Sequence, residues 1–71
     1  MTPSTLLREI GEALHGSDRW RRPLGAQIGR DERTVYRYER GVSPIPADVW
    51  QALRPHLEAR RAELGKLLER L

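Results

Sequence analysis

The chain has 71 residues, a net charge of +3 and no cysteine. This length allows one domain at most, with a small core, because so short a chain buries only about 60% of its unfolded surface. The lack of cysteine excludes disulfides, thiolate metal sites and a cysteine nucleophile, and two histidines far apart in sequence do not predict zinc. We therefore expect no metal and no cofactor, and a small scaffold that associates to complete its core.

The basic residues are unevenly distributed. Residues 18–40 hold seven of the 13 basic side chains against four acidic ones, and every basic residue except Lys66 is an arginine. Arginine makes paired hydrogen bonds to phosphates and to guanine edges, although a GC-rich coding bias also raises the arginine content. No apolar run approaches the ~20 residues of a membrane span, so we expect a cytoplasmic protein, bacterial or phage-encoded, with no membrane contact.

Helices and turns are predicted throughout, because no alternating β-branched run is long enough for a strand. The first helix is predicted over residues 4–15, with Thr2 or Ser4 as its cap and Gly16 as its end. Its expected inner face consists of Leu6, Ile10, Ala13 and Leu14.

A second helix is predicted over about residues 19–28. Pro23 fits a first turn but not a helix interior, so the helix begins near Arg22 or its first turn is irregular. Gly29 supplies the left-handed stop. The expected core residues are Trp20, Leu24 and Ile28.

The third predicted helix covers about residues 32–40, between an Asp31 cap and a Gly41 stop. Val35 and Tyr38 share one side and are expected to pack on the core. The other side carries residues at i, i+3, i+4 and i+7, namely Arg33, Tyr36, Arg37 and Arg40. A short helix with one apolar face and one arginine-rich face is suited to a nucleic-acid groove.

Residues 47–71 are predicted to be helical, and Pro55 is expected to bend or break this helix. We expect one helix ending near Arg54 and another over about residues 55–70, and a single bent helix is the alternative. Apolar residues recur there at spacings of three, four or seven, with one polar defect at Arg60. We expect them to join two copies of the chain, and an intramolecular cap is the alternative. The expected dimer contacts are Trp50, Leu53, Leu57, Leu64, Leu67 and Leu71.

The segment 21–41 resembles the helix-turn-helix of the Cro/cI-repressor (XRE-type) DNA-binding family. A small residue, an apolar residue and a turn glycine stand at Gly25, Ile28 and Gly29. The run Thr34-Val35-x-Arg37-Tyr38-Glu39-x-Gly41 then resembles the family pattern T-[I/V]-x-R-W-E-x-G, with tyrosine in place of tryptophan. The resemblance covers roughly a third of the chain. Its departures are Gly25 where alanine is usual, Arg30 where an apolar residue is usual and Asp31 where serine is common.

The resemblance implies an all-α, small helix-turn-helix bundle of four to five helices with extended C-terminal helices. Residues 1–46 would form the DNA-binding core, with the helix-turn-helix at 21–41, and residues 47–71 the dimerisation segment. The resemblance implies a DNA-binding regulator. From the small size of the chain we expect an autoregulatory homodimeric repressor of the phage, antitoxin or anti-CRISPR-associated type. It would bind double-stranded DNA at an inverted-repeat operator, with successive major grooves about 34 Å apart, and be nucleoid-associated when bound.

Two groups of DNA-contacting side chains follow. Arg33 and Arg37 are expected to fork onto guanine edges, Glu32 to accept from cytosine or to steer Arg33, and Tyr36 to touch a thymine methyl group or a phosphate. For each, the alternative is a solvated or packed helix face. The expected phosphate contacts are Arg21, Arg22, Arg30, Thr34 and Arg40. Glu39 is expected to pair with a nearby arginine.

Two other functions remain open. The helices of residues 47–71 suit an antitoxin-like module that binds a protein partner, and the arginine-rich patch suits a nucleic-acid binder without sequence preference, including an RNA binder. Enzyme activity is not expected, because the sequence has no nucleophile–base pair, no phosphate-cradling glycine loop and no carboxylate cluster.

Overall fold

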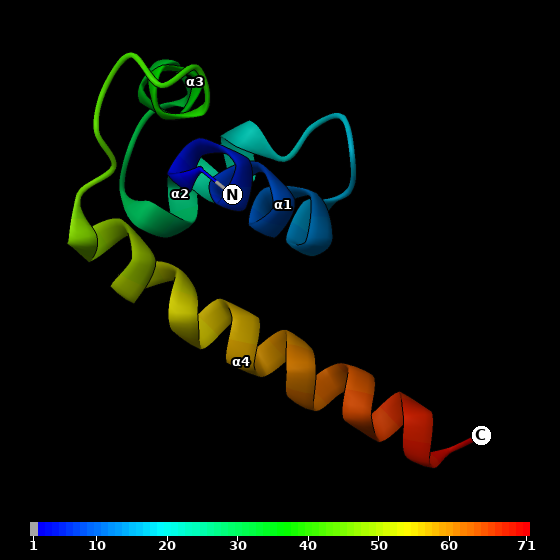
Figure 1. Cartoon of the computed structure of the whole chain (residues 1–71). Coiled ribbons are helices and arrows are strands. Elements are labelled where there is room, and N and C mark those ends of the chain that lie inside the picture. The colour runs from blue at the N-terminus through cyan, green and yellow to red at the C-terminus, as the bar shows by residue number, and fades with distance from the viewer. Residues whose placement is uncertain (1) are drawn as a thin grey trace.

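A computed structural model describes residues 2–71, and in this range the regular elements are helices only: α1 (Pro3–His15), α2 (Arg21–Ile28), α3 (Glu32–Glu39) and α4 (Ala47–Glu69). The predicted all-α class is confirmed, with four helices. Figure 1 shows α1, α2 and α3 gathered into a head from which α4 extends. Within residues 2–71, no helix combines the length and the apolar character that crossing a membrane requires.

The helix starts follow the predicted capping chemistry at α1 and α3. The Thr2 hydroxyl accepts from the Thr5 N–H at 3.1 Å, and the Asp31 carboxylate accepts from the Thr34 N–H at 2.9 Å. Helix α2 begins at Arg21, two residues after the outer predicted limit at residue 19 and next to the start near Arg22 that Pro23 indicates. This start places Pro23 in the first turn, where a missing N–H costs no helical hydrogen bond.

The core surrounds Trp20, whose side chain is fully buried between α1 and the other helices. Its neighbour in α1 is Gly11, where an added Cβ would lie 2.1 Å from Trp20 Cε3. The expected inner face of α1 is correct in part: Ile10 packs against the core and Leu14 is half-buried, whereas Leu6 and Ala13 are exposed and Leu7 and Gly11 are buried instead. The complete core consists of Leu7, Trp20, Leu24, Ile28, Val35, Tyr38, Val49 and Leu53.

Helix α4 continues through Pro55, so the predicted break there is wrong. Pro55 and Gln51, whose carbonyl would accept the missing hydrogen bond, are both exposed, so that water can take the place of the N–H. The start of α4 belongs to the same core as the head, because Val49 and Leu53 are core residues. The core therefore extends across residue 46, where the sequence analysis divides the chain into two segments.

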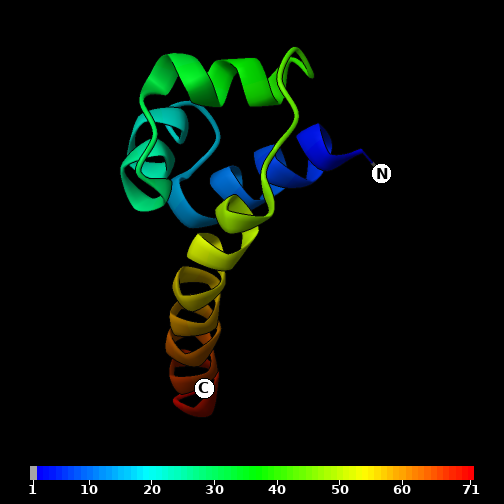
Figure 2. The same ribbon diagram turned by 90° about the vertical axis from the view of Figure 1, so that its left-hand side faces the viewer.

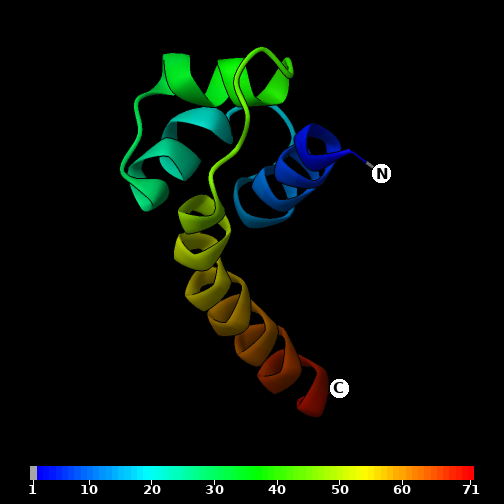
Figure 3. The ribbon, with the colours of Figure 1, turned by 60° about the vertical axis from the view of Figure 1, so that its left-hand side comes forward.

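Polar contacts fix α3 to α1 and α4 to the head. Ser4 Oγ donates to the Tyr38 carbonyl at 2.8 Å and so joins the start of α1 to α3. The Gln27 side chain lies between two imidazoles, 2.8 Å from His15 Nε2 and 3.2 Å from His56 Nδ1, and links α1, α2 and α4. Figures 2 and 3 show the result, with α3 across one end of the molecule and the C-terminal end of α4 at the other.

Candidate nucleic-acid interface

Helix α3 has the two faces that its sequence indicates. Val35 is fully buried and Tyr38 is 5% exposed, so one face is anchored in the core. The opposite face is open to solvent and carries Glu32, Arg33, Tyr36, Arg37 and Arg40. The four expected base-contacting residues therefore lie together on one accessible surface.

The start of α2 lies beside this surface. Trp20 occupies its N-cap and accepts no hydrogen bond through its side chain, so the positive end of the helix has no side-chain acceptor. A hollow of about 310 Å³ separates this end from α3. Its lining combines basic, acidic and aromatic side chains: Asp18, Arg19, Arg21, Arg22, Pro23, Glu32 and Tyr36. The fold thus places expected phosphate contacts of α2 next to expected base contacts of α3.

Arg21 is the structural link between these two helices. Its Nε and Nη2 both donate to the Glu39 carboxylate, the latter at 2.7 Å, and its guanidinium carbon lies 4.8 Å from the ring centroids of both Trp20 and Tyr36. The paired hydrogen bonds lower the pKa of Glu39 and raise the pKa of Arg21. Glu39 pairs with an arginine as predicted, but its partner is Arg21 on another helix, 18 positions away, and not an arginine close in sequence. Arg21 thereby ties α2 to α3 and stacks on Tyr36.

Arg30 is also bound within the fold. Its Nη2 donates to Asp48 Oδ2 at 2.9 Å and its Nη1 to the Ile28 carbonyl at 3.0 Å, which ties the turn between α2 and α3 to the start of α4. The bond to Asp48 raises the pKa of Arg30. Arg30 therefore attaches the turn by an ion pair and not by burial of an apolar side chain.

The remaining phosphate candidates divide into one bound and two open residues. Thr34 is half-buried, and both its N–H and its hydroxyl donate to Asp31, which lowers the pKa of that carboxyl. Arg22 and Arg40 are exposed, and within residues 2–71 neither forms an ion pair. The structure thus leaves these two arginines as the open positive charges at the border of the α3 surface.

The expected dimer contacts are not all available. Leu53 is 1% exposed and belongs to the core, so its assignment to a dimer interface is wrong. The heptad spacing in residues 47–71 does not distinguish a core residue from a dimer contact, because the same face of α4 packs on the core at its start and is open to solvent further along. Leu64 and Leu67 are each half-exposed, and Leu68, which the sequence reasoning missed, is 70% exposed.

Sequence reasoning also missed the contacts that Arg21 and Arg30 make. The partners Glu39 and Asp48 are each 18 positions away, and no helical spacing relates residues on different elements. Among residues 2–71, no group of three or more histidine or acidic side chains could hold a metal ion. A comparison with known proteins identifies no relative: no protein-family model, no curated protein and no solved structure matches the chain.

Proposed function

We propose that this chain is a sequence-specific DNA-binding transcriptional regulator that acts as a homodimer. The observation that carries the proposal is the outward face of α3, on which Arg33 and Arg37 are exposed and form no ion pair among the described residues. A protruding α-helix has the width of a major groove, which is about 12 Å. Arginine is also the side chain best suited to guanine, through its O6 and N7 atoms.

The way α3 is held supports base reading. Its start is capped by Asp31, its inner face is buried, and Arg21 and Ser4 bind its C-terminal half through Glu39 and the Tyr38 carbonyl. A recognition surface must keep its side chains in one geometry, and a helix fixed at three places does so better than a loop. In the complex, Arg33 and Arg37 contact guanine and Glu32 accepts from cytosine.

Phosphate contacts are assigned to the residues that remain free. Arg22 at the start of α2 and Arg40 at the end of α3 flank the reading face, and the N-terminus of α2 offers N–H groups and a positive dipole end. Arg21 and Arg30 add positive charge near the DNA but act mainly as structural residues. Tyr36, 45% exposed and stacked on Arg21, contacts either a thymine methyl group or a phosphate.

The resemblance of residues 21–41 to the Cro/cI-repressor type supports the same function. Two copies would place α3 in successive major grooves about 34 Å apart, so that the operator is an inverted repeat. A dimer seated on its own promoter blocks polymerase, which makes autoregulatory repression the simplest action. Activation of that promoter in a reporter assay would contradict the repressor assignment and leave DNA binding intact.

The test is selection of binding sites from random duplex DNA, followed by titration of the selected site against a scrambled one at physiological salt. We expect an inverted repeat, and an affinity for it at least roughly 10³-fold above that for the scrambled duplex. Equal, weak and salt-sensitive binding to both duplexes would mean that the arginine-rich face binds nucleic acid through charge alone.

A second candidate function is protein binding through α4, as in an antitoxin-like module. The exposed leucines near its end, Leu64, Leu67 and Leu68, favour it. Two variants, Arg37→Ala and Leu67→Asp, distinguish the two functions. A regulator loses operator affinity with the first substitution, whereas a protein-binding module loses its partner with the second and is insensitive to the first.

A further inference from the structure

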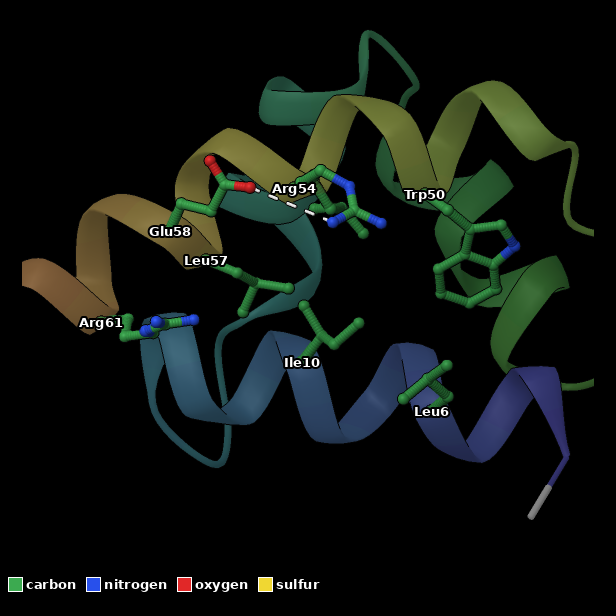
Figure 4. A pocket seen from close by; sticks show the side chains of 8 residues that line it. Leu6, Ile10, Trp50, Arg54, Leu57, Glu58 and Arg61 are labelled. Carbon is green, nitrogen blue, oxygen red and sulfur yellow. Dashed lines mark ion pairs between the residues drawn. The ribbon is translucent and has the colours of Figure 1, made fainter.

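A groove between α1 and α4 shares no residue with the surface assigned to DNA. Its volume is about 390 Å³, at the small end of the range of about 300–1,000 Å³ that small-molecule sites occupy. Figure 4 shows Leu6 and Ile10 of α1 facing Trp50 and Leu57 of α4 across the groove. The proposed function does not use this groove.

The groove has apolar walls that are incompletely covered. Leu53, which is 1% exposed and belongs to the core, is its most deeply buried lining residue. Ile10, Trp50 and Leu57 are half-buried, and Leu6 is 39% exposed. These side chains come from two helices and surround one opening, so an apolar molecule seated there removes contiguous apolar surface from water.

The groove has two walls over a short distance only. On α1 the lining runs from Leu6 to Ile10, about 6 Å at 1.5 Å per residue, which is little more than one helical turn. A partner helix, about 10–12 Å wide with its side chains, would be held between both walls for about one turn. A small molecule fits within this length, and the shape of the groove therefore favours a small ligand over a peptide.

The border of the groove is positively charged. Its charged lining residues are Arg54, Glu58 and Arg61, which leave one excess positive charge. The distance between Arg54 Nη1 and Glu58 Oε1 is 4.0 Å, too long for a hydrogen bond, and both side chains are exposed. Arg61 forms no ion pair within residues 2–71. Both guanidinium groups therefore keep donors for an acceptor at the mouth of the groove.

An apolar hollow bordered by arginines is complementary to a molecule with an apolar body and one acidic group. The planar guanidinium group offers two parallel donors to the two oxygens of a carboxylate. A phosphate monoester carries about two negative charges and is repelled more strongly by Glu58. We propose that the groove between α1 and α4 binds a small apolar carboxylate. The hydrocarbon part lies between Ile10 and Trp50, and the carboxylate accepts hydrogen bonds from the arginines of the border.

This inference goes beyond the proposed function and does not depend on it. Trp50 and Leu57 are also expected dimer contacts, so a second copy of the chain is the competing occupant of the groove. A chain that binds no carboxylate can still bind its operator, and the two proposals therefore fail independently.

The direct test is isothermal titration calorimetry of the full chain with octanoate, octanol and octylamine, which differ in charge but share their hydrocarbon part. We expect one octanoate per chain and a dissociation constant about tenfold or more below that of either other compound. The reason is that only the carboxylate gains charge-assisted hydrogen bonds to arginine. Equal affinities would overturn the assignment to a carboxylate, and the absence of saturable octanoate binding would overturn the site.

Two double variants with the same net charge test the border. Arg54→Gln/Arg61→Gln removes both guanidinium groups from the groove, whereas Arg60→Gln/Arg70→Gln removes two that do not line it. All four positions are exposed, so both variants should keep the fold. We expect the first variant to weaken octanoate binding about tenfold and to leave octanol binding unchanged, and the second to change neither. Equal losses of octanoate binding would show a general attraction by charge and reject the site.

A variant that fills the groove tests the location. Leu6→Trp places a larger side chain in the hollow and is expected to weaken the binding of octanoate and octanol alike, about tenfold or more. Unchanged affinity would place octanoate on the exposed leucines near the end of α4 and overturn the site. Octanoate binding by the wild-type chain that weakens as the chain concentration rises would show that a second copy occupies the groove, which also contradicts the proposal.

Discussion

The head and the far half of α4 differ in what holds them in place. In the head, core side chains are at most 5% exposed, and two of its arginines form ion pairs with Glu39 and with Asp48 at the start of α4. From residue 58 onward, every side chain of α4 is exposed, and the local support is limited to ion pairs such as that between Arg60 and Glu63. The head is therefore stabilised by its own packing, whereas a helix extending alone is marginal in water. This half of α4 therefore lacks the buried side chains that hold the head together.

The largest expected effect comes from removing the side chain at the centre of the head. Trp20→Ala is expected to cost about 3–5 kcal/mol of unfolding free energy, most of what a chain of this size possesses. Leu68→Ala, on the far half of α4, should change it by less than about 0.5 kcal/mol. Denaturant unfolding, at dilutions where the midpoint no longer depends on protein concentration, measures both. Similar losses would contradict the contrast between the two regions.

Two glycines test the same difference between the head and the far half of α4, because a Gly→Ala substitution should lower the stability at one and raise it at the other. Gly11→Ala places a Cβ 2.1 Å from Trp20 Cε3 and is expected to destabilise the fold by about 1–3 kcal/mol. Around Gly65 there is no atom within 4 Å of an added Cβ, so Gly65→Ala should stabilise α4 by up to about 1 kcal/mol. The thermal midpoint reports both, and a lower midpoint for Gly65→Ala would show that this half of α4 is closely packed.

Two neighbouring arginines at the start of α2 are expected to differ in their effect on stability, because Arg21 forms an ion pair within the fold and Arg22 is exposed. Arg21→Ala removes both hydrogen bonds to Glu39 and the stacking on Tyr36, and is expected to cost about 1–2 kcal/mol of unfolding free energy. Arg22→Ala should leave the unfolding free energy within about 0.5 kcal/mol of wild type. Chemical denaturation followed by circular dichroism distinguishes them, and equal stability would mean that the Arg21–Glu39 pair contributes nothing.

The same pair gives the head a smaller dependence on pH. Because Arg21 lowers the pKa of Glu39 in the folded chain, this carboxylate stabilises the fold above the ordinary glutamate pKa of about 4.3, and the contribution is lost as the pH falls through the folded value. Glu39→Gln should therefore lose stability less steeply than wild type in that acid range. Parallel curves of unfolding free energy against pH for the two proteins would contradict the role of the pair.

Most of the head could be predicted from sequence, because its signals are local. The Asp31 cap, the Gly29 and Gly41 stops and the two faces of α3 each depend on spacing within one helix. Part of the inner face of α1 was missed because Gly11 has no side chain to mark it as apolar, although its lack of a Cβ is what admits Trp20.

The remaining errors concern contacts between elements. Pro55 predicts a break from local geometry, but the helix persists because the lost hydrogen bond faces solvent. The sequence does not show which arginines form ion pairs within the fold and which are free to contact DNA. Arg21 and Glu39, like Arg30 and Asp48, lie on different elements, and no spacing along one helix relates them. The structure also explains why position 25 is a glycine: an added Cβ would lie 2.7 Å from the Arg30 carbonyl oxygen in the turn after α2.

The measurement that tests the division of labour on the DNA surface most directly is a comparison of Arg37→Ala with Arg22→Ala on the selected operator and its single-base-pair variants. We expect Arg37→Ala to cost about 1–3 kcal/mol of binding free energy and to abolish the preference at one base step. Arg22→Ala should weaken binding to all sequences alike and reduce the dependence of log affinity on log salt by about one unit. The same uniform loss from both variants would contradict the assignment of α3 to base reading.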